Sequence, residues 1–397
     1  MKVCFETFGC RLNRAEALDR EAECIARGWE VVENHADADV FIVRGCSVTA
    51  RAQRDSERFI EHLKRKYPMK KLIVEGCLKA TNTLFSRKML PDAPPTANLG
   101  VPVPTRTARA YLKIQDGCSG NCTFCIVPQF RGKSRSVPFE DVIDRAKRFI
   151  ESGYREIVVT GCNLSLYASE GKKLPDLLDA LSTLDSPDGI GGCRIRIGSL
   201  SPGECALETV SLMSERKNIC RFLHIPVQSG SPRVLAAMRR DYTVKDVEHL
   251  AERAKKLIPQ IALGCDMMTG FPGETEMEFL ATKGLMKRIG FSNAHIFPYS
   301  KRPGTVAAGL PESISESVSH ARAHALADLS METRYNFARK FLGKIVEIVV
   351  EDAESCSGWT SEYLPCRANI PGIRKSIAKI VVTKVHHDAS MEGLIRH

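Results

Sequence analysis

The sequence predicts an α/β protein with three parts: an N-terminal parallel α/β domain, a partial barrel of six β/α units and a small antiparallel β module. Short apolar strands alternate with amphipathic helical stretches over most of the chain, a pattern typical of parallel sheets covered by helices. Near the C-terminus this alternation gives way to β-branched runs without helices between them. We place the domains at residues 1–92, 109–338 and 339–397, with a linker over residues 93–108.

The N-terminal domain is expected to contain three strands, with a helix after each of the first two. These elements are predicted at Val3–Phe8, Asn13–Arg27, Val40–Val43, Thr49–Lys66 and Lys71–Glu75. A glycine–cysteine pair ends each strand: Gly9-Cys10, Gly45-Cys46 and Gly76-Cys77. Because residues just past the carboxyl ends of parallel strands line one crevice, the three cysteines are expected to converge there. Three separate buried thiols are the alternative interpretation.

The central part of the chain predicts an incomplete barrel. Prolines concentrated between residues 91 and 104 indicate the linker that precedes it. Helical patterns then separate six strands, and six units favour an open barrel over a closed one of eight. The strands are predicted at Ala110–Gln115, Glu156–Thr160, Arg194–Gly198, Phe222–Val227, Ala262–Met268 and Asn293–Pro298. Three of the helices are predicted at Phe139–Ser152, Val244–Leu257 and Thr275–Ile289.

A C-x3-C-x2-C motif, Cys118, Cys122 and Cys125, follows the first strand of this barrel. Three thiolates at this spacing can bind three irons of a [4Fe–4S] cluster and leave the fourth iron open. A closed zinc site would need a fourth ligand, and no Cys or His follows Cys125 at ordinary spacing. The motif therefore predicts an iron–sulfur cluster whose open iron S-adenosylmethionine can chelate before it is split to a radical.

Composition argues against a membrane protein and against a secreted disulfide scaffold. No apolar run reaches membrane-spanning length, and the first residues lack a signal-peptide core. Fifteen cysteines without an export signal favour a reducing compartment, the cytoplasm, and metal ligation over disulfides. The net charge of +10 is compatible with a polyanionic partner such as nucleic acid.

Over nearly its whole length the chain resembles the radical S-adenosylmethionine methylthiotransferases. The matching runs are Gly9–Asn13, Cys46–Thr49, Gln115–Pro128, Leu223–Ser231, Gly270–Thr275 and Phe297–Thr305. The resemblance implies a radical S-adenosylmethionine partial (β/α)6 barrel and a C-terminal antiparallel β-barrel of the TRAM kind, which contains the β-branched runs Lys344–Val350 and Ile377–Val385. It also implies two [4Fe–4S] clusters: Cys118, Cys122 and Cys125 would hold the radical-generating one, and Cys10, Cys46 and Cys77 an auxiliary one.

The same resemblance implies the reaction, in which one S-adenosylmethionine methylates a sulfur and another supplies the radical. The most similar branch modifies C2 of N6-threonylcarbamoyladenosine beside the tRNA anticodon, as judged from Cys46–Ala50, from Arg51, Arg54 and Ser56, and from Phe297–Thr305. Sister branches act on isopentenyladenosine in tRNA or on an aspartate of a ribosomal protein. A metal-containing RNA-binding module is the alternative that is not an enzyme.

The expected partners are the anticodon stem-loop of a tRNA and a reductant protein such as flavodoxin or ferredoxin. We expect a monomer without membrane attachment. The basic residues between Arg51 and Lys71 form either a phosphate track or an ordinary solvated helix face.

Because the clusters and S-adenosylmethionine perform the chemistry, no catalytic side chain is assigned. Position along the barrel predicts cofactor contacts from Phe124, Gly161, Asn163, Ser199, Gln228 and Ser229. Two basic residues depart from the family pattern, Arg44 and Lys79; each either adds charge near the auxiliary cluster or lies on the surface. Cys162 either approaches the cofactor or is a small buried thiol.

Overall fold

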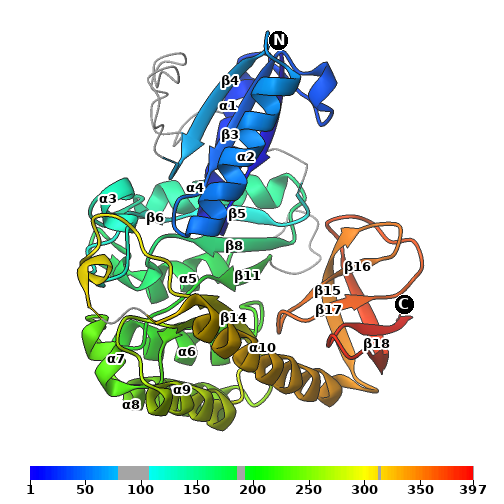
Figure 1. Cartoon of the computed structure of the whole chain (residues 1–397). Helices are drawn as coiled ribbons and strands as arrows, with labels where there is room; N and C mark the ends of the chain where they lie inside the picture. The colour runs from blue at the N-terminus through cyan, green and yellow to red at the C-terminus, as the bar shows by residue number, and fades with distance from the viewer. Residues whose placement is uncertain (79–106, 186–192, 312–313, 397) are drawn as a thin grey trace.

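The computed structural model describes residues 1–78, 107–185, 193–311 and 314–396. Residues 79–106, which include Lys79 and all but the end of the predicted linker, lie outside this description. Figure 1 shows the N-terminal domain in blue above a larger barrel in cyan to yellow, with a small β-barrel in orange and red at one side. The fold class predicted from the sequence is confirmed.

The N-terminal domain is a four-stranded parallel sheet in the order β2-β1-β3-β4. Its elements are β1 (Lys2–Thr7), α1 (Arg11–Ala26), β2 (Glu30–Val31), β3 (Val40–Gly45), α2 (Ala50–Lys66) and β4 (Lys71–Gly76). Successive strand residues face opposite sides of the sheet. Phe41 and Val43 therefore pack with Ile60 of α2, whereas Val40 and Ile42 pack with Cys24 of α1. The two-residue strand β2 was not predicted.

The central barrel consists of six parallel strands in two three-stranded sheets, β11-β8-β5 and β12-β13-β14. Single β-bridges, Ile195 to Ile219 and Ser199 to His224, connect the two sheets. The strands are β5 (Ala110–Lys113), β8 (Glu156–Thr160), β11 (Arg194–Ile197), β12 (Phe222–Gln228), β13 (Ala262–Thr269) and β14 (Asn293–Pro298). The first predicted strand is interrupted after Lys113, because Gln115–Asp116 (β6) pairs instead with Arg135–Ser136 (β7).

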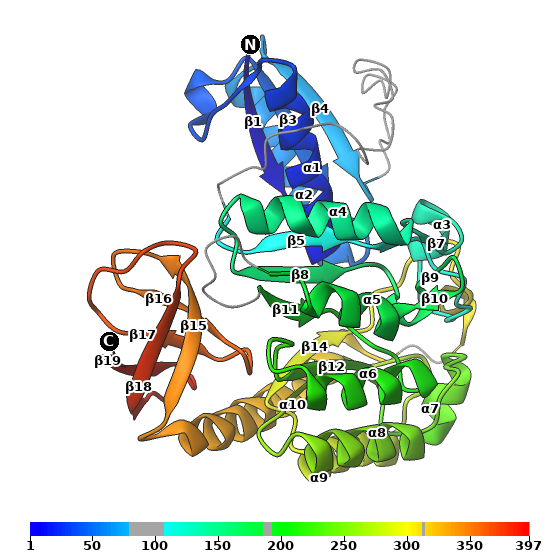
Figure 2. The ribbon, with the colours of Figure 1, turned by 180° about the vertical axis from the view of Figure 1, so that it is seen from behind.

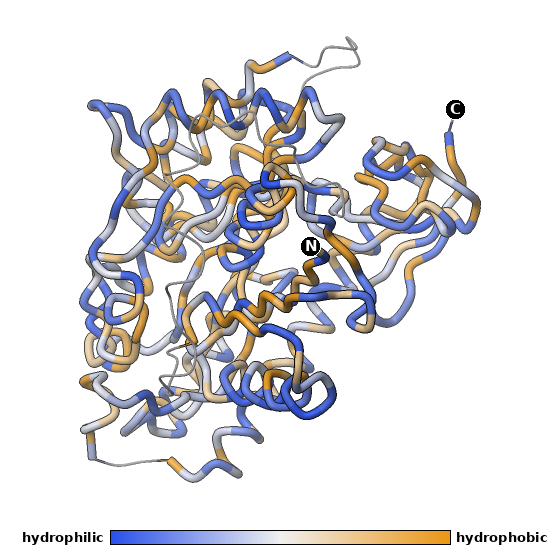
Figure 3. Tube along the Cα trace, turned by 90° about the horizontal axis from the view of Figure 1, so that it is seen from above, coloured by the Kyte–Doolittle hydropathy of each residue, from blue (hydrophilic) through white to orange (hydrophobic). Residues whose placement is uncertain are grey.

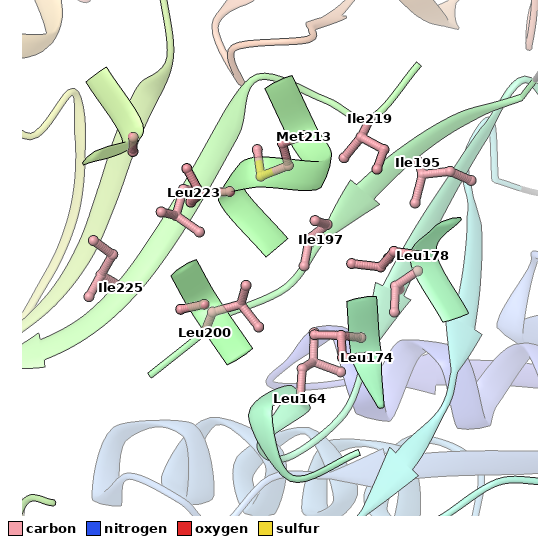
Figure 4. Packing of buried hydrophobic residues seen from close by; sticks show 14 of the residues in the cluster. Leu164, Leu174, Leu178, Ile195, Ile197, Leu200, Met213, Ile219, Leu223 and Ile225 are labelled. Atoms are coloured by element: carbon pink, nitrogen blue, oxygen red, sulfur yellow. The ribbon is translucent and has the colours of Figure 1, made fainter. Parts of the chain in front are cut away.

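Helices cover the outer side of the barrel (Figure 2). They are α3 (Val127–Arg131), α4 (Phe139–Glu151), α5 (Leu174–Ser182), α6 (Glu204–Glu215), α7 (Pro232–Ala237), α8 (Val244–Leu257), α9 (Glu276–Ile289) and α10 (Glu316–Ala338). Two short strands, β9 (Ala168–Ser169) and β10 (Lys172–Lys173), precede α5. In Figure 3 hydrophilic and hydrophobic residues alternate along the helical segments, as in amphipathic helices that pack on a core. Figure 4 shows Ile195, Ile197, Leu223 and Ile225 of the strands packed with helical residues such as Leu178.

Helix α1 of the N-terminal domain lies on the opposite face of the barrel sheet. Leu112 and Val159 face the barrel helices, so their neighbours Tyr111 and Val158 point the other way. These two residues pack against Ala15 and Leu18 of α1. The N-terminal domain is thereby fixed on the first two barrel strands.

The C-terminal strands close into a barrel in the order β15-β16-β17-β19-β18. They are β15 (Ile345–Asp352), β16 (Ser357–Thr360), β17 (Pro365–Arg367), β18 (Ile377–Val385) and β19 (Met391–Ile395). Four pairings are antiparallel, and β17 pairs with β19 in parallel. Within the described ranges, every helix is too short or too polar to cross a membrane.

The small barrel docks onto the N-terminal ends of the central strands. Arg194 donates to the backbone oxygens of Glu347 and Trp359, and Arg196 donates to that of Thr360 at 2.8 Å. Both arginines also bind the fully buried Glu156. This end of the central barrel is covered. The opposite end, where the strands finish, is its rim.

Candidate functional site

The structure brings Cys10, Cys46 and Cys77 together at the carboxyl ends of the neighbouring strands β1, β3 and β4. A Cβ atom added to Gly9 would lie 2.7 Å from the Cys46 Sγ. The Cys77 amide donates to the Gly45 oxygen at 3.0 Å. The three thiols are close enough that the charges of Cys10 and Cys77 contribute to the raised pKa of Cys46, after the larger effect of burial.

Local backbone geometry explains the glycines before Cys10 and Cys77. Gly9 and Gly76 have φ angles of +92° and +85°, which side-chain-bearing residues rarely adopt. A Cβ on Gly76 would also meet the Gly45 oxygen at 2.6 Å. Asn13 holds the turns together, because its Nδ2 donates to the backbone oxygens of Phe8 (2.9 Å) and Gly45 (3.1 Å).

The second cysteine set, Cys118, Cys122 and Cys125, lies in the loop between β6 and α3. Its ends are anchored, since the Cys118 amide donates to the Gly132 oxygen and Thr123 donates to the Ala237 oxygen. A Cβ added to Gly120 would lie 3.3 Å from the Cys118 Sγ and 4.0 Å from that of Cys122. Arg240, which follows α7, donates from Nη1 to the Cys122 Sγ at 3.0 Å.

An arginine that follows the second set reaches a cysteine of the first. Arg131, the last residue of α3, donates from Nε to the Cys77 Sγ at 3.2 Å. It also binds Glu16 of α1 and Asp116 of β6. Burial alone would raise the pKa of Glu16, but Arg131, Lys113 and Arg44 outweigh burial and lower that pKa to about 2. The Glu16 carboxylate is therefore ionised, and it binds Arg44 of its own domain as well as Lys113 and Arg131 of the barrel.

The cysteine environments suit metal ligation. Burial raises the pKa of Cys125 to about 11 and also raises the pKa of Cys77, an effect that Arg131 partly opposes. Such thiols stay protonated near neutral pH unless a metal ion displaces the proton. Arginine N–H groups donate to Cys77 and Cys122. Each set of three cysteines therefore fits the ligation of an iron–sulfur cluster better than it fits three separate thiols of an apolar core.

The predicted cofactor contacts fall into two groups. Gly161 and Asn163 follow β8, and Gln228 is the last residue of β12. The Asn163 amide donates to the Gln115 Oε1 at 2.9 Å, and a Cβ on Gly161 would lie 2.8 Å from that oxygen. Gln228 has a φ of +68°, and its buried Oε1 has no hydrogen-bond partner. An oxygen in this state fits a cofactor group that donates a hydrogen bond.

The other three candidates have different surroundings. Ser229 is fully buried, and its hydroxyl lies 3.3 Å from that of Thr282 on α9. Phe124 packs on the apolar cluster that includes Met238 and Phe271. Ser199 is exposed. The contact of Ser229 with Thr282 could not be predicted from position along the chain.

Arg44 and Cys162 both lie close to the candidate site. The Arg44 guanidinium binds Glu16 at 2.6 Å and Glu75 at 2.7 Å, so its charge is paired and does not extend into solvent. Cys162 is half-buried, with its Sγ 3.7 Å from Asp116 Oδ1, and burial raises its pKa to about 12.

Several polar residues that the structure brings together had no role predicted from the sequence. Arg131 and Arg240 carry no sequence signal beyond their proximity to motifs. His224, Asp266 and His295 lie on β12, β13 and β14, with their donor atoms within 4.8 Å of one another. Asp266 Oδ1 is 3.0 Å from His224 and 3.3 Å from His295, and these contacts outweigh burial and hold the Asp266 pKa well below its usual range.

Comparisons with known proteins agree with this geometry. Residues 112–286 match the model of the radical SAM superfamily, and residues 2–94 match "Uncharacterized protein family UPF0004". The chain is 33% identical to threonylcarbamoyladenosine tRNA methylthiotransferase MtaB of Bacillus subtilis, over 96% of this chain and 93% of that protein. It is 31% identical to the tRNA-2-methylthio-N(6)-dimethylallyladenosine synthase of Methylacidiphilum infernorum, over 92% and 91%.

The fold is also found among solved structures. The radical S-adenosylmethionine methyltransferase TsrM from Kitasatospora setae, with cobalamin and a [4Fe–4S] cluster bound, matches with a TM-score of 0.56 and 14% sequence identity. The match covers 77% of this chain and 76% of that one. At this identity the likeness concerns the fold.

Proposed function

Because the chain belongs to the radical S-adenosylmethionine methylthiotransferases, we propose that it inserts a methylthio group at C2 of N6-threonylcarbamoyladenosine beside a tRNA anticodon. The family membership predicted from the motifs is confirmed, and with it the enzyme class. The cofactors of the family, [4Fe–4S] clusters and S-adenosylmethionine, are those of this enzyme.

Each cysteine set holds one cluster in this proposal. Cys118, Cys122 and Cys125 bind the cluster that receives S-adenosylmethionine, and Cys10, Cys46 and Cys77 bind the auxiliary cluster. When bound, the clusters and S-adenosylmethionine supply the reductive radical chemistry that an aromatic C–H bond requires. The protein's own residues position these groups, and the free Oε1 of Gln228 with the Gly161–Asn163 turn supports cofactor binding at the strand ends.

The observation that supports this assignment best is the position of Arg131, which lies just after one cysteine set and donates a hydrogen bond to the other. Arg131 follows the Cys118–Cys125 loop by a few residues, yet it donates to Cys77 of the other set. An enzyme that joins radical formation to sulfur insertion needs both groups near one substrate. An RNA-binding module with a single structural metal would not need two cysteine sets close together.

Basic residues near the rim support an RNA substrate. Helix α2 begins beside the loop after β14, where the Ala50 amide donates to Ser300 at 3.0 Å. The side chains of Arg54 and Arg58 on α2 are exposed. Phosphate contacts by such residues would dominate RNA affinity and orient a stem-loop toward the rim.

The alternative substrate is isopentenyladenosine, because the synthase from Methylacidiphilum infernorum is nearly as similar as the MtaB protein. Mass spectrometry of tRNA nucleosides from a strain that lacks the gene separates the two. We expect loss of the 2-methylthio derivative of N6-threonylcarbamoyladenosine, with its unmodified form accumulating. Loss of the 2-methylthio derivative of isopentenyladenosine instead would show that this enzyme acts on isopentenyladenosine, as the sister branch does.

Complementation provides the matched control. The wild-type gene and the Cys205→Ala variant should both restore the modification, because Cys205 lies on α6 outside both cysteine sets. Cys46→Ala should not restore it. If all tRNA nucleosides remain unchanged in the deletion strain, a tRNA substrate is refuted. A flavodoxin-like or ferredoxin-like reductant and a monomeric state remain predictions.

A further inference from the structure

Arg131 is held in one orientation by all of its donors. Five N–H groups are available on a guanidinium. Nε donates to Cys77, Nη1 to Glu16 at 2.9 Å and to Asp116 at 3.0 Å, and Nη2 to Asn13 at 2.9 Å and to Glu16 at 3.2 Å. The side chain is 9% exposed. It is therefore a fixed donor toward the Cys77 sulfur rather than a mobile surface charge.

The residues around Arg131 come from both domains. Asn13 and Glu16 belong to α1, whereas Asp116 precedes the Cys118–Cys125 loop and Arg131 follows it. Lys113 binds both carboxylates, at 2.6 Å and 2.8 Å. The contact with Cys77 consequently exists only while the N-terminal domain and the central barrel are docked.

A hydrogen bond to a cluster-ligating sulfur withdraws electron density from it and raises the cluster's reduction potential. Arg240 makes the equivalent contact with Cys122, at 3.0 Å. Each cysteine set thus receives one arginine N–H from an element that does not carry its cysteines.

We propose that Arg131 is a positioning residue that raises the reduction potential of the auxiliary cluster and makes that potential depend on docking to the radical domain. This inference rests on the proposed function only in that it requires a cluster on Cys10, Cys46 and Cys77. The parallel role of Arg240 toward the cluster on Cys118, Cys122 and Cys125 provides an internal control.

The test uses the full chain with Cys118, Cys122 and Cys125 all changed to alanine, so that it binds only the auxiliary cluster. Arg131→Lys keeps the charge but cannot reproduce the planar fork of donors. EPR-monitored redox titration should show a more negative midpoint. At the parent's midpoint the ratio of reduced to oxidised cluster should fall about tenfold, which corresponds to about 59 mV for one electron. Arg240→Lys in the same background should leave the midpoint unchanged.

A second readout needs no substitution of Arg131. Arginine labelled with ¹⁵N should show a hyperfine coupling to the reduced auxiliary cluster in the parent protein. An unshifted midpoint in Arg131→Lys, or no coupling to arginine nitrogen, would overturn the role of Arg131 while leaving the proposed function intact. A parent protein that binds no iron would overturn both.

Discussion

At the scale of single residues, the proposed function predicts separate roles for the two cysteine sets. Cys122 belongs to the loop expected to bind S-adenosylmethionine through its cluster, whereas Cys10 stands at the start of α1 in the other domain. We predict that Cys10→Ala still releases deoxyadenosine under strong reductant but inserts no sulfur, and that Cys122→Ala does neither. Chromatography of the small-molecule and nucleoside products measures both activities. Equal product from the two variants would contradict this division.

Gly9 provides a second prediction, because its backbone angle and its neighbour both exclude a side chain. Gly9→Ala would place a Cβ 2.7 Å from the Cys46 Sγ, and the left-handed conformation adds about 1–2 kcal/mol of strain. We expect the variant to lose the auxiliary cluster and retain the other, so that iron content falls by about half. Gly28→Ala is the matched control, since Gly28 has a φ of +77° but no atom within 4 Å of the added Cβ.

Helix α2 is the element whose surface charge we connect to RNA. Replacing Arg54 and Arg58 with alanine should weaken tRNA binding and reduce the slope of log affinity against log salt by about two, because each arginine would no longer neutralise one phosphate. Filter-binding assays at several salt concentrations measure this slope. The exposed residues Arg253 and Lys256 on α8 are the control pair. The same slope change in both double variants would contradict a specific role for α2.

Helix α1 shows why some of the site lies beyond sequence prediction. The strand-ending glycine–cysteine pairs and the C-x3-C-x2-C loop have local signals, so the placement of these cysteines at strand ends and the fold class could be predicted. Arg131, Glu16 and Lys113 meet only because α1 packs on β5 and β8. Such contacts depend on tertiary docking and leave no periodic pattern in the sequence. The packing of Ser229 against Thr282 escaped prediction for the same reason.

At the scale of the whole molecule, Glu156 connects the central barrel to the C-terminal barrel. Burial would raise its pKa, but Arg194, Arg196 and Arg109 lower it to about 2 from its ordinary value of 4.5. A lowered folded-state pKa gives stability that is complete above about pH 4.5 and is lost as pH falls toward 2. Thermal unfolding followed across this range should show a decline in midpoint.

Glu156→Gln tests that prediction directly. Removing the carboxylate leaves buried arginines without their partner, which should cost about 3–5 kcal/mol of unfolding free energy. The variant should also lose the part of the acid sensitivity that depends on Glu156. Denaturant unfolding at pH 7 and at pH 4 compares the two proteins. Unchanged stability at pH 7 would contradict the central place of Glu156 in docking.

Iron and sulfide analysis of the anaerobically reconstituted full chain tests the two-cluster arrangement most directly. Wild type should contain about eight irons per chain, and each triple Cys→Ala variant, in Cys10, Cys46 and Cys77 or in Cys118, Cys122 and Cys125, about four. Mössbauer spectra should assign this iron to [4Fe–4S] clusters. A wild-type protein with about four irons, or zinc in place of iron in either set, would contradict the account.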